Sequence, residues 1–546
     1  MVQLISIFSY FVVLLRAAIL CFQTVAVGGI LFLLLAARRE ELRSEALLNP
    51  AWKLIRWSAL GIILSQVFFG VSNSLLLIHS AELPLRTVLG ANYVLAGLLA
   101  ILAGVAIDFW PTGKRKKMSP WLLLPAAMML AASVMTSHSA ARMEDRAFLS
   151  SMTALHYLAT ASWIGGLPYL LLALKRVPDE AVKTQIVRNF SRLAMVSVAV
   201  LFAAGLAMSL VYVGSWDALY GTAYGAMVTT KVILFGCMLL LGAANFLIVR
   251  KIGPEGGSGT ASLPRFAEVE IGIGLSVILA AASLTSQPPA VDLTQDRVSL
   301  QEIATRFAPR MPRFSSPNVK ELSESTNAML KRAMAEGKTV PTSFVPGQFA
   351  ADTNKPADIA WSEYNHSWAG LVVFLMGILA LLARSRYFPW ANIWPLMFLG
   401  LALFLFLRAD PENWPLGPNG FWESFAVPDV LQHRAAVLLI IVFAIFTWRV
   451  ETGRMKSMSA ALVFPGVCVL GGMVLLTHSH ALGNVKEELL VELSHTSLAI
   501  LGIIAGWSRW LELRLPQTSK APKYLSWIWP VCFILVGLVL MDYHES

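Results

Sequence analysis

The sequence contains little charge and few cysteines. Of its 546 residues only 14% are charged, whereas 56% are hydrophobic, and a soluble domain has about 25% charged residues. This composition excludes a cytosolic enzyme, a disordered chain and a disulfide-rich secreted domain. The four cysteines each lie inside an apolar block and form no CxxC pair. We therefore expect them to be small buried hydrophobic side chains.

The chain also lacks the motifs of ATP-driven pumps and hydrolases. It has no P-loop, no HExxH zinc motif and no Ser/His/Asp arrangement in a recognisable context. We therefore predict a protein that is not an enzyme and is not driven by ATP. The net charge of +10 falls mostly in loops between apolar blocks. Such a distribution indicates membrane topology and no nucleic-acid partner.

Apolar blocks run through most of the chain. Each is long enough to cross a hydrocarbon core of roughly 30 Å as a helix. We predict an all-α, polytopic bundle in a lipid bilayer, with about 14 transmembrane helices. The predicted spans are 8–36, 54–79, 86–109, 119–137, 147–174, 190–213, 223–250, 266–286, 366–383, 388–407, 428–448, 458–477, 488–507 and 524–542.

Lysine and arginine are concentrated in every second short loop. The loops 38–56, 114–117 and 509–523 are basic, whereas the alternating loops between them contain few cations. Because basic loops stay on the cytoplasmic side, this bias predicts that both termini lie outside. The long polar segment 287–365 separates the blocks. We predict an eight-helix domain over 1–286, an external loop or linker over 287–365, and a six-helix domain over 366–546.

All nine histidines fall in external loops or in the outer part of a helix in this topology. The inner loops contain none. Neutral imidazole is a ligand that suits copper, zinc and haem iron. The outer face is therefore predicted to be a metal or haem platform. The histidines are His79, His138, His156, His366, His433, His478, His480, His495 and His544.

Two groups of histidines share one arrangement. His138 lies at a helix exit and His156 lies in the following helix; His478 and His480 stand in the same relation to His495. A polar group inside a membrane normally faces partners in the bundle. For His138 and His156, two interpretations remain: metal ligation, or hydrogen bonding between helices. The second group is likewise a candidate set of metal ligands.

His366 and His433 each open a helix of the second domain and are further candidate metal ligands facing the second group. Glu492 precedes His495 by three residues, so both lie on nearly one helix face. The carboxylate either orients that imidazole as a hydrogen-bond acceptor or is solvated.

Four other side chains are candidates for gating or support. Met143, between His138 and His156, is a soft ligand suited to Cu(I). Trp163 either closes over a bound cation or belongs to a close-packed Trp-Ile-Gly-Gly turn. Arg16 and Lys231 are basic residues inside predicted spans. A charged residue within a membrane span is a candidate functional residue by default. Lys231 either pairs with a carboxylate or extends outward to the membrane surface.

Several motifs resemble the copper resistance protein D (CopD) family. The resemblance covers roughly residues 1–286. It implies an eight-helix bacterial inner-membrane (plasma-membrane) protein that moves copper from the periplasm toward the cytoplasm, with functional weight on His138, His156, Trp163 and Lys231. The motifs are Ser137-His138-Ser139-Ala140, Leu155-His156-Tyr157-Leu158-Ala159 through Trp163-Ile164-Gly165-Gly166, Phe190-Ser191-Arg192-Leu193-Ala194, and Thr222-Ala223-Tyr224-Gly225 followed by Lys231.

Three functions are therefore compared. The first is copper transport or copper tolerance, with copper captured at the outer histidines and moved across the membrane. The second is a b-type haem protein of membrane electron transfer, with outer histidines as axial ligands. The third is an accessory subunit that delivers copper to a cuproenzyme. A periplasmic copper chaperone is a partner consistent with the external loops.

Overall fold

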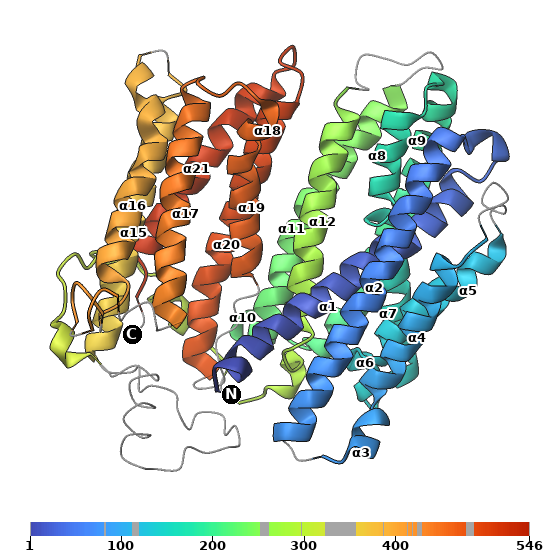
Figure 1. Cartoon of the computed structure of the whole chain (residues 1–546), viewed down its shortest axis with the longest axis horizontal. Coiled ribbons are helices and arrows are strands. Elements are labelled where there is room, and N and C mark those ends of the chain that lie inside the picture. Colours follow the sequence, from blue (N-terminus) through green and yellow to red (C-terminus); the bar gives the residue numbers. More distant parts are fainter. Residues whose placement is uncertain are drawn as a thin grey trace. The chain divides into compact units, whose positions relative to one another are not determined.

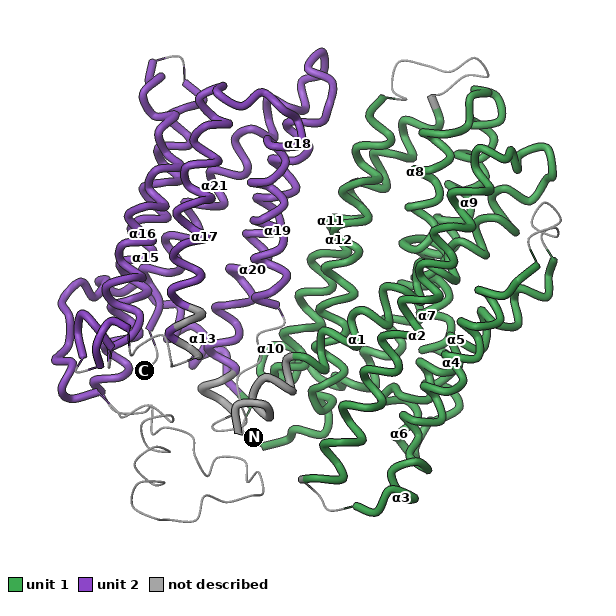
Figure 2. Tube along the Cα trace, viewed as in Figure 1, with its two compact units in different colours: residues 1–297, 342–344 green, residues 298–341, 345–546 purple. Residues whose placement is uncertain are grey.

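The computed structural model describes two compact units, which are shown in Figure 2. Unit 1 is formed by the described residues up to 297, and unit 2 by the described residues from 298 onward. The described residues are 2–80, 83–111, 119–251, 261–295, 297–322, 356–385, 387–411, 413–417, 419–422, 428–476 and 485–544.

Unit 1 is a bundle of helices (Figure 1). Its helices are α1 (Val2–Leu31), α2 (Glu45–Ser80), α3 (Leu85–Leu89), α4 (Asn92–Asp108), α5 (Leu123–Met135), α6 (His138–Ala141), α7 (Arg146–Trp163), α8 (Leu167–Arg176), α9 (Glu180–Tyr212), α10 (Trp216–Gly221), α11 (Ala223–Lys251) and α12 (Leu263–Leu284). In Figure 1, α3, α6 and α10 lie at the lower end of this unit, here called the α6 end.

Unit 2 is a second helical bundle, built mainly on the pairs α15–α21, α19–α20 and α20–α21. Its helices are α13 (Leu300–Arg306), α15 (Pro356–Leu382), α16 (Met397–Arg408), α17 (Pro428–Glu451), α18 (Met458–Ala461), α19 (Val463–Leu475), α20 (Val485–Arg514) and α21 (Ala521–Met541). The 3-10 helix Pro389–Leu396 leads into α16.

The predicted all-helical membrane class is confirmed. Twelve helices in the described part of the chain are long and apolar enough to cross a membrane. The predicted spans 86–109 and 119–137 correspond to the shorter apolar helices Asn92–Asp108 and Pro120–Met135. The described residues form no strand beyond one isolated bridge between Asn413 and Asn419.

Small residues allow the helices of unit 1 to cross closely. Gly165 lies at the junction of α7 and α8, where a Cβ atom would meet the main-chain oxygen of Thr24 in α1. A Cβ at Gly28 would in turn meet the backbone of Gly165. Because lipid tails are as apolar as the helices themselves, this van der Waals packing between small residues is what holds membrane helices together.

Unit 2 contains a compact ion cluster at the ends of three helices. The Arg509 guanidinium lies 2.6 Å from Glu451 Oε1 and 2.7 Å from Glu512 Oε1. Arg384 also pairs with Glu512 at 3.1 Å, and the Trp529 indole N–H donates to the second oxygen of that carboxylate. Both acidic groups therefore have charged partners, which offsets much of their desolvation.

We predict that Gly165→Ala destabilises the protein, because the added methyl group meets the backbone of α1 and has no flexible side chain to displace. Overpacking of this kind costs about 1–3 kcal/mol. The measurement is the thermal unfolding midpoint of the detergent-purified chain. Gly70→Ala is the matched control, since nothing lies within 4 Å of a Cβ there. Equal midpoints for the two variants would contradict this account of the crossing.

Candidate functional site

An aromatic and polar cluster surrounds His138 at the α6 end of unit 1. The His138 ring centroid lies 6.3 Å from that of Tyr212 in α9 and 6.2 Å from that of Tyr224 in α11. Its Nε2 atom lies 3.5 Å from the main-chain oxygen of Leu284, at the end of α12. Burial lowers the pKa of His138 and Arg16 lowers it further, and together they outweigh the opposing effects of the Leu284 hydrogen bond and of Asp292. The imidazole is therefore held in its neutral, ligating form.

Two arginines flank this cluster, and each has a partner. The Arg142 guanidinium lies 3.6 Å from Asp292 and 5.9 Å from the centre of the Tyr212 ring. Arg16 donates from one nitrogen to both the main-chain and the hydroxyl oxygen of Thr285, at 3.0 Å each. The predicted intramembrane cation Arg16 is thus bound to the end of α12 through hydrogen bonds.

His156 lies deeper in the bundle, on α7. Its Nδ1 atom is buried and has no hydrogen-bond partner among the described residues. The ring packs on α9 at Gly205, where a Cβ would lie 3.7 Å from both Nδ1 and Cε1. Lys231 of α11 is its charged neighbour. The predicted residue Lys231 is thus within electrostatic range of His156.

A buried carboxylate lies one level further along α7. Glu270 of α12 is 2% exposed, and Asn245 of α11 donates to its Oε1 atom at 2.6 Å. The indole N–H of Trp163, a side chain that is 3% exposed, also donates to this carboxyl group. Our sequence reasoning considered Trp163 but missed Asn245 and Glu270. The available signal was an acidic residue inside the apolar block 266–286.

These groups form three successive levels through unit 1. On α9, seven residues separate Tyr212, which contacts His138, from Gly205, which contacts His156. On α7, seven residues separate His156 from Trp163. Each interval corresponds to about 10 Å at 1.5 Å per residue. His138 and His156 are therefore separate stations and do not share one coordination sphere. No group of three or more potential metal ligands occurs among the described residues.

Met143 does not join either histidine. Its side chain is 91% exposed in the turn between α6 and α7. A thioether in this position is accessible from outside the bundle.

In unit 2, two predicted ligands lie beside one tyrosine. The His366 ring stacks on Tyr543 at 3.9 Å between centroids, and the His495 ring lies 6.3 Å from the same tyrosine. The His366 Nδ1 atom is 2.8 Å from the main-chain oxygen of Ser362, and the His495 Nδ1 atom is 3.0 Å from that of Val491. When Nδ1 carries the proton, Nε2 bears the lone pair that a metal requires.

The other predicted residues of unit 2 are placed as follows. The His433 Nδ1 atom lies 2.7 Å from Asp410 Oδ1, a pairing that fixes the orientation of the imidazole. Glu492 lies in α20 directly after Val491, whose carbonyl contacts His495. His478 and His480 lie outside the described residues, so their relation to His495 stays a prediction.

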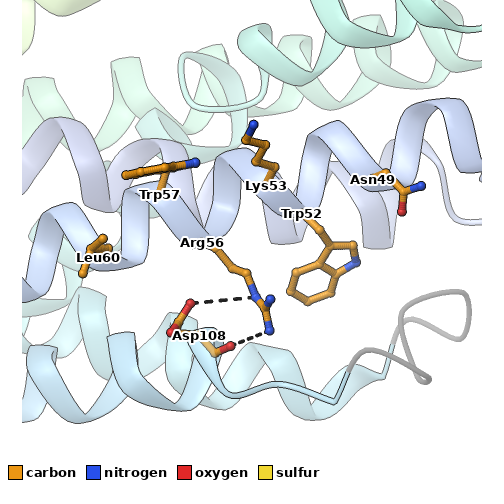
Figure 3. Close-up of a pocket in the computed structure, with 7 residues that line it drawn as sticks. All are labelled: Asn49, Trp52, Lys53, Arg56, Trp57, Leu60 and Asp108. Carbon is orange, nitrogen blue, oxygen red and sulfur yellow. Dashed lines mark hydrogen bonds and ion pairs between the residues drawn. The ribbon is translucent and has the colours of Figure 1, made fainter.

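One cavity of unit 1 has no histidine in its lining. It has a volume of about 430 Å³ and is lined by residues of α2 together with Asp108 of α4. Figure 3 shows Arg56 pointing toward Asp108, with its guanidinium 2.6 Å from the main-chain oxygen. Its lining of tryptophan and cationic side chains is typical of a membrane surface. The lining residues are Asn49, Trp52, Lys53, Arg56, Trp57, Leu60 and Asp108.

Comparisons with known proteins identify part of unit 1. Residues 184–284 match the family model described as copper resistance protein D, which confirms the resemblance over this stretch. The copper transport protein CutJ of Bacillus subtilis (strain 168) is 31% identical over 215 residues, which cover 38% of this chain and 38% of that relative. No solved structure matches the chain. The family match includes Lys231, Asn245 and Glu270 and begins after His138 and His156.

We predict that His138 stays neutral to a lower pH than an ordinary histidine. Because burial lowers its folded-state pKa, the fold favours the neutral ring. The contribution of the neutral His138 ring to the stability of the folded protein is fully present above the unfolded-state pKa of about 6.5. It is lost as the pH falls below that value. Histidine-labelled NMR titration in detergent measures this, with His138→Gln assigning the signal. A His138 signal that titrates at or above the ordinary value would contradict the prediction.

Proposed function

Residues 184–284 form a domain of the copper resistance protein D family, and from this premise we propose that the chain transports copper across the bacterial inner membrane. Unit 1 provides the path. The α6 end faces the periplasm, as do both termini, so copper is captured at outer histidines and moves inward. A periplasmic copper chaperone would supply the ion at this face.

The observation that carries the proposal is the series of polar levels along unit 1. A polar side chain inside a bilayer costs free energy because it is removed from water. Polar side chains within membrane spans are therefore expected to have a functional role. Here an imidazole at the α6 end is followed by a second imidazole about 10 Å deeper. Neutral imidazoles are suitable ligands for copper. His138 is therefore the capture station and His156 the station within the membrane.

Lys231 favours the monovalent ion at the second station. Coulomb repulsion rises in proportion to the charge of the passing ion. A fixed ammonium group beside His156 therefore opposes Cu²⁺ about twice as strongly as Cu⁺. This makes Cu(I) the transported form, in agreement with the exposed thioether of Met143 at the periplasmic surface, since thioethers select Cu(I).

Unit 2 provides a further capture site on the same face in this proposal. His366 and His495 come from two helices and lie beside one tyrosine ring, with each Nδ1 atom at a carbonyl of its own helix. Second partners of this type orient metal-binding imidazoles. The pair is assigned to copper, and it also carries the second candidate function, since two histidines on neighbouring helices are suitable axial ligands for haem b.

We expect His156→Ala to reduce copper uptake strongly, because the variant lacks the ligand at the middle of the path. Removing a metal-supporting side chain typically costs 10–100-fold in affinity or activity, so uptake is expected to fall by at least about tenfold. The assay uses full-length protein in liposomes that contain a trapped Cu(I) chelator, with Cu(I) and ascorbate added outside.

His79→Ala is the matched control, because this exposed histidine lies near the end of α2 and outside all three levels. It should transport at the wild-type rate. Wild-type liposomes that accumulate no more copper than empty liposomes would rule out transport. Equal uptake by the two variants would remove His156 from the path.

For unit 2, we expect the purified chain to bind copper and to show no haem Soret band. Metal analysis of wild type beside His366→Ala and His495→Ala should show less bound copper in both variants. His544→Ala serves as the control, since its ring nitrogens contact the main-chain oxygens of Asp542 and Thr305. A Soret band that disappears in His366→Ala and His495→Ala would instead support the haem function.

A further inference from the structure

Glu270 is the one buried carboxylate in the described part of the chain. It lies in α12, inside the membrane-spanning segment Leu263–Leu284. The neighbouring acid Glu268 differs, because it pairs with Arg265 at 2.9 Å on the same helix. An unpaired carboxylate in a membrane is expensive and marks an ion or proton path.

The partners of Glu270 are neutral donors from two other helices. Asn245 Nδ2 lies 2.6 Å from Glu270 Oε1, and Trp163 also donates to the carboxyl group. The other end of the amide is left incomplete: Asn245 Oδ1 is buried and has no hydrogen-bond partner among the described residues. A buried acceptor of this kind costs about 1–3 kcal/mol.

Protonation of the carboxyl group would supply the missing donor. A carboxylic acid and a primary amide form reciprocal hydrogen bonds, in which the amide N–H donates to one carboxyl oxygen and the acid O–H donates to the amide oxygen. The ionised carboxylate can only accept. With one proton bound, every hydrogen-bonding atom of the Asn245–Glu270 pair therefore has a partner. When that proton leaves, the indole N–H of Trp163 and the amide N–H of Asn245 stabilise the ionised carboxylate.

The donor set suits a proton better than copper. Carboxylate and amide oxygens are hard ligands, whereas Cu(I) prefers imidazole, thioether and thiolate groups. Glu270 also lies at another level of the bundle than His156, since its partner Trp163 is about 10 Å further along α7 and its partner Asn245 is about 21 Å beyond Lys231 along α11. It is therefore too far away to bind the same ion, but in a low-dielectric interior it still responds to the charge of that ion.

The charged and titratable side chains on the surrounding helices lie at other levels. On α11, Lys231 is fourteen residues before Asn245, or about 21 Å along the helix, and Arg250 contacts Phe246. The Tyr169 hydroxyl of α8 donates to the carbonyl of Val25. The remaining groups on helices packed against α12 are Arg16 and Cys21 of α1, Lys175 and Arg176 of α8, and Tyr224, Cys237 and Lys251 of α11. On α7, which supplies Trp163, they are Arg146, His156 and Tyr157.

We propose that Glu270 is a proton-binding site that exchanges a proton for each Cu(I) ion passing through unit 1. Copper at His156 favours the ionised carboxylate, so the proton leaves when the ion arrives. Departure of the ion allows the carboxyl group to take up a proton again, and no covalent bond other than O–H forms or breaks. This inference rests on the proposed transport of copper and adds its coupling to protons.

The test uses full-length protein in liposomes that contain a trapped pH-sensitive dye, with Cu(I) and ascorbate added outside. Wild-type protein should move protons out of the liposomes as copper enters. Glu270→Gln keeps the shape and an acceptor for Asn245 but holds no exchangeable proton, so copper-driven proton movement should fall to the level of empty liposomes.

Glu268→Gln is the matched control, two residues away on the same helix, where the carboxylate has a cation partner in Arg265. It should behave as the wild type. A second measurement, in detergent and weakly buffered solution at several pH values between about 6 and 8, counts protons released on Cu(I) binding. Glu270→Gln should release fewer protons per chain than Glu268→Gln, with the larger difference at the lower pH.

The two proposals fail differently. If wild-type liposomes accumulate no copper, the proposed function is wrong. If the wild type accumulates copper but Glu270→Gln still moves protons with it, or releases as many protons on binding as Glu268→Gln, the assignment of Glu270 is overturned. Asn245→Ala guards against a folding defect, since it keeps the carboxyl group and should retain proton exchange with an altered pH profile. An unaltered profile would count against the amide–acid pair.

Discussion

The structure depends on one constraint: a polar group within hydrocarbon must find its partners inside the protein. Unit 2 meets this constraint with opposite charges. Arg509 lies between Glu451 and Glu512, so each carboxylate has a cation within 3 Å. Neither unit meets it fully. In the unit 2 cluster, Arg384 Nε and Nη2 are buried without hydrogen-bond partners among the described residues, and unit 1 contains groups of the same kind. Asn245 Oδ1 and His156 Nδ1 are buried without hydrogen-bond partners among the described residues. Completed networks stabilise a fold, whereas incomplete ones retain the capacity to bind something further.

Small residues create the space in which these polar side chains with missing hydrogen-bond partners lie. Gly205 leaves room on α9 for the His156 ring, and a Cβ added at Gly242 on α11 would lie 4.0 Å from the Trp163 indole. Gly165 follows Trp163 closely and lets α7 meet α1 backbone to backbone. The Trp-Ile-Gly-Gly motif therefore has the close packing that one interpretation of the sequence predicted, while closure of Trp163 over a cation stays a prediction. Its glycines set the helix crossing, and that crossing directs the indole N–H of Trp163 toward Glu270.

Much of this fold could be predicted because hydropathy and length decide whether a segment spans a membrane. Candidate residues such as His156 and Lys231 were visible as polar positions in apolar blocks, and Lys231 lies within electrostatic range of His156. Their true partners were not visible. Which face of α9 meets His138 depends on helix rotation and on contacts between segments more than seventy residues apart, such as Tyr212 and His138. Glu270 was not visible for a different reason, since no histidine lies near it in the sequence to mark it as part of a site.

Charge balance explains how a carboxylate and a lysine at different levels of the bundle can act together in the proposed exchange of copper and protons. Lys231 brings a positive charge into the membrane, and Glu270 lies at another level of the same bundle. With Cu(I) bound and Glu270 ionised, the two side chains and the ion carry a net charge of about +1. With copper absent and Glu270 protonated, Lys231 alone gives the same total. Changing the net charge of a membrane interior costs free energy. An exchange of Cu(I) for a proton keeps that net charge constant, so its barrier is lower than the barrier for moving Cu(I) alone or a proton alone.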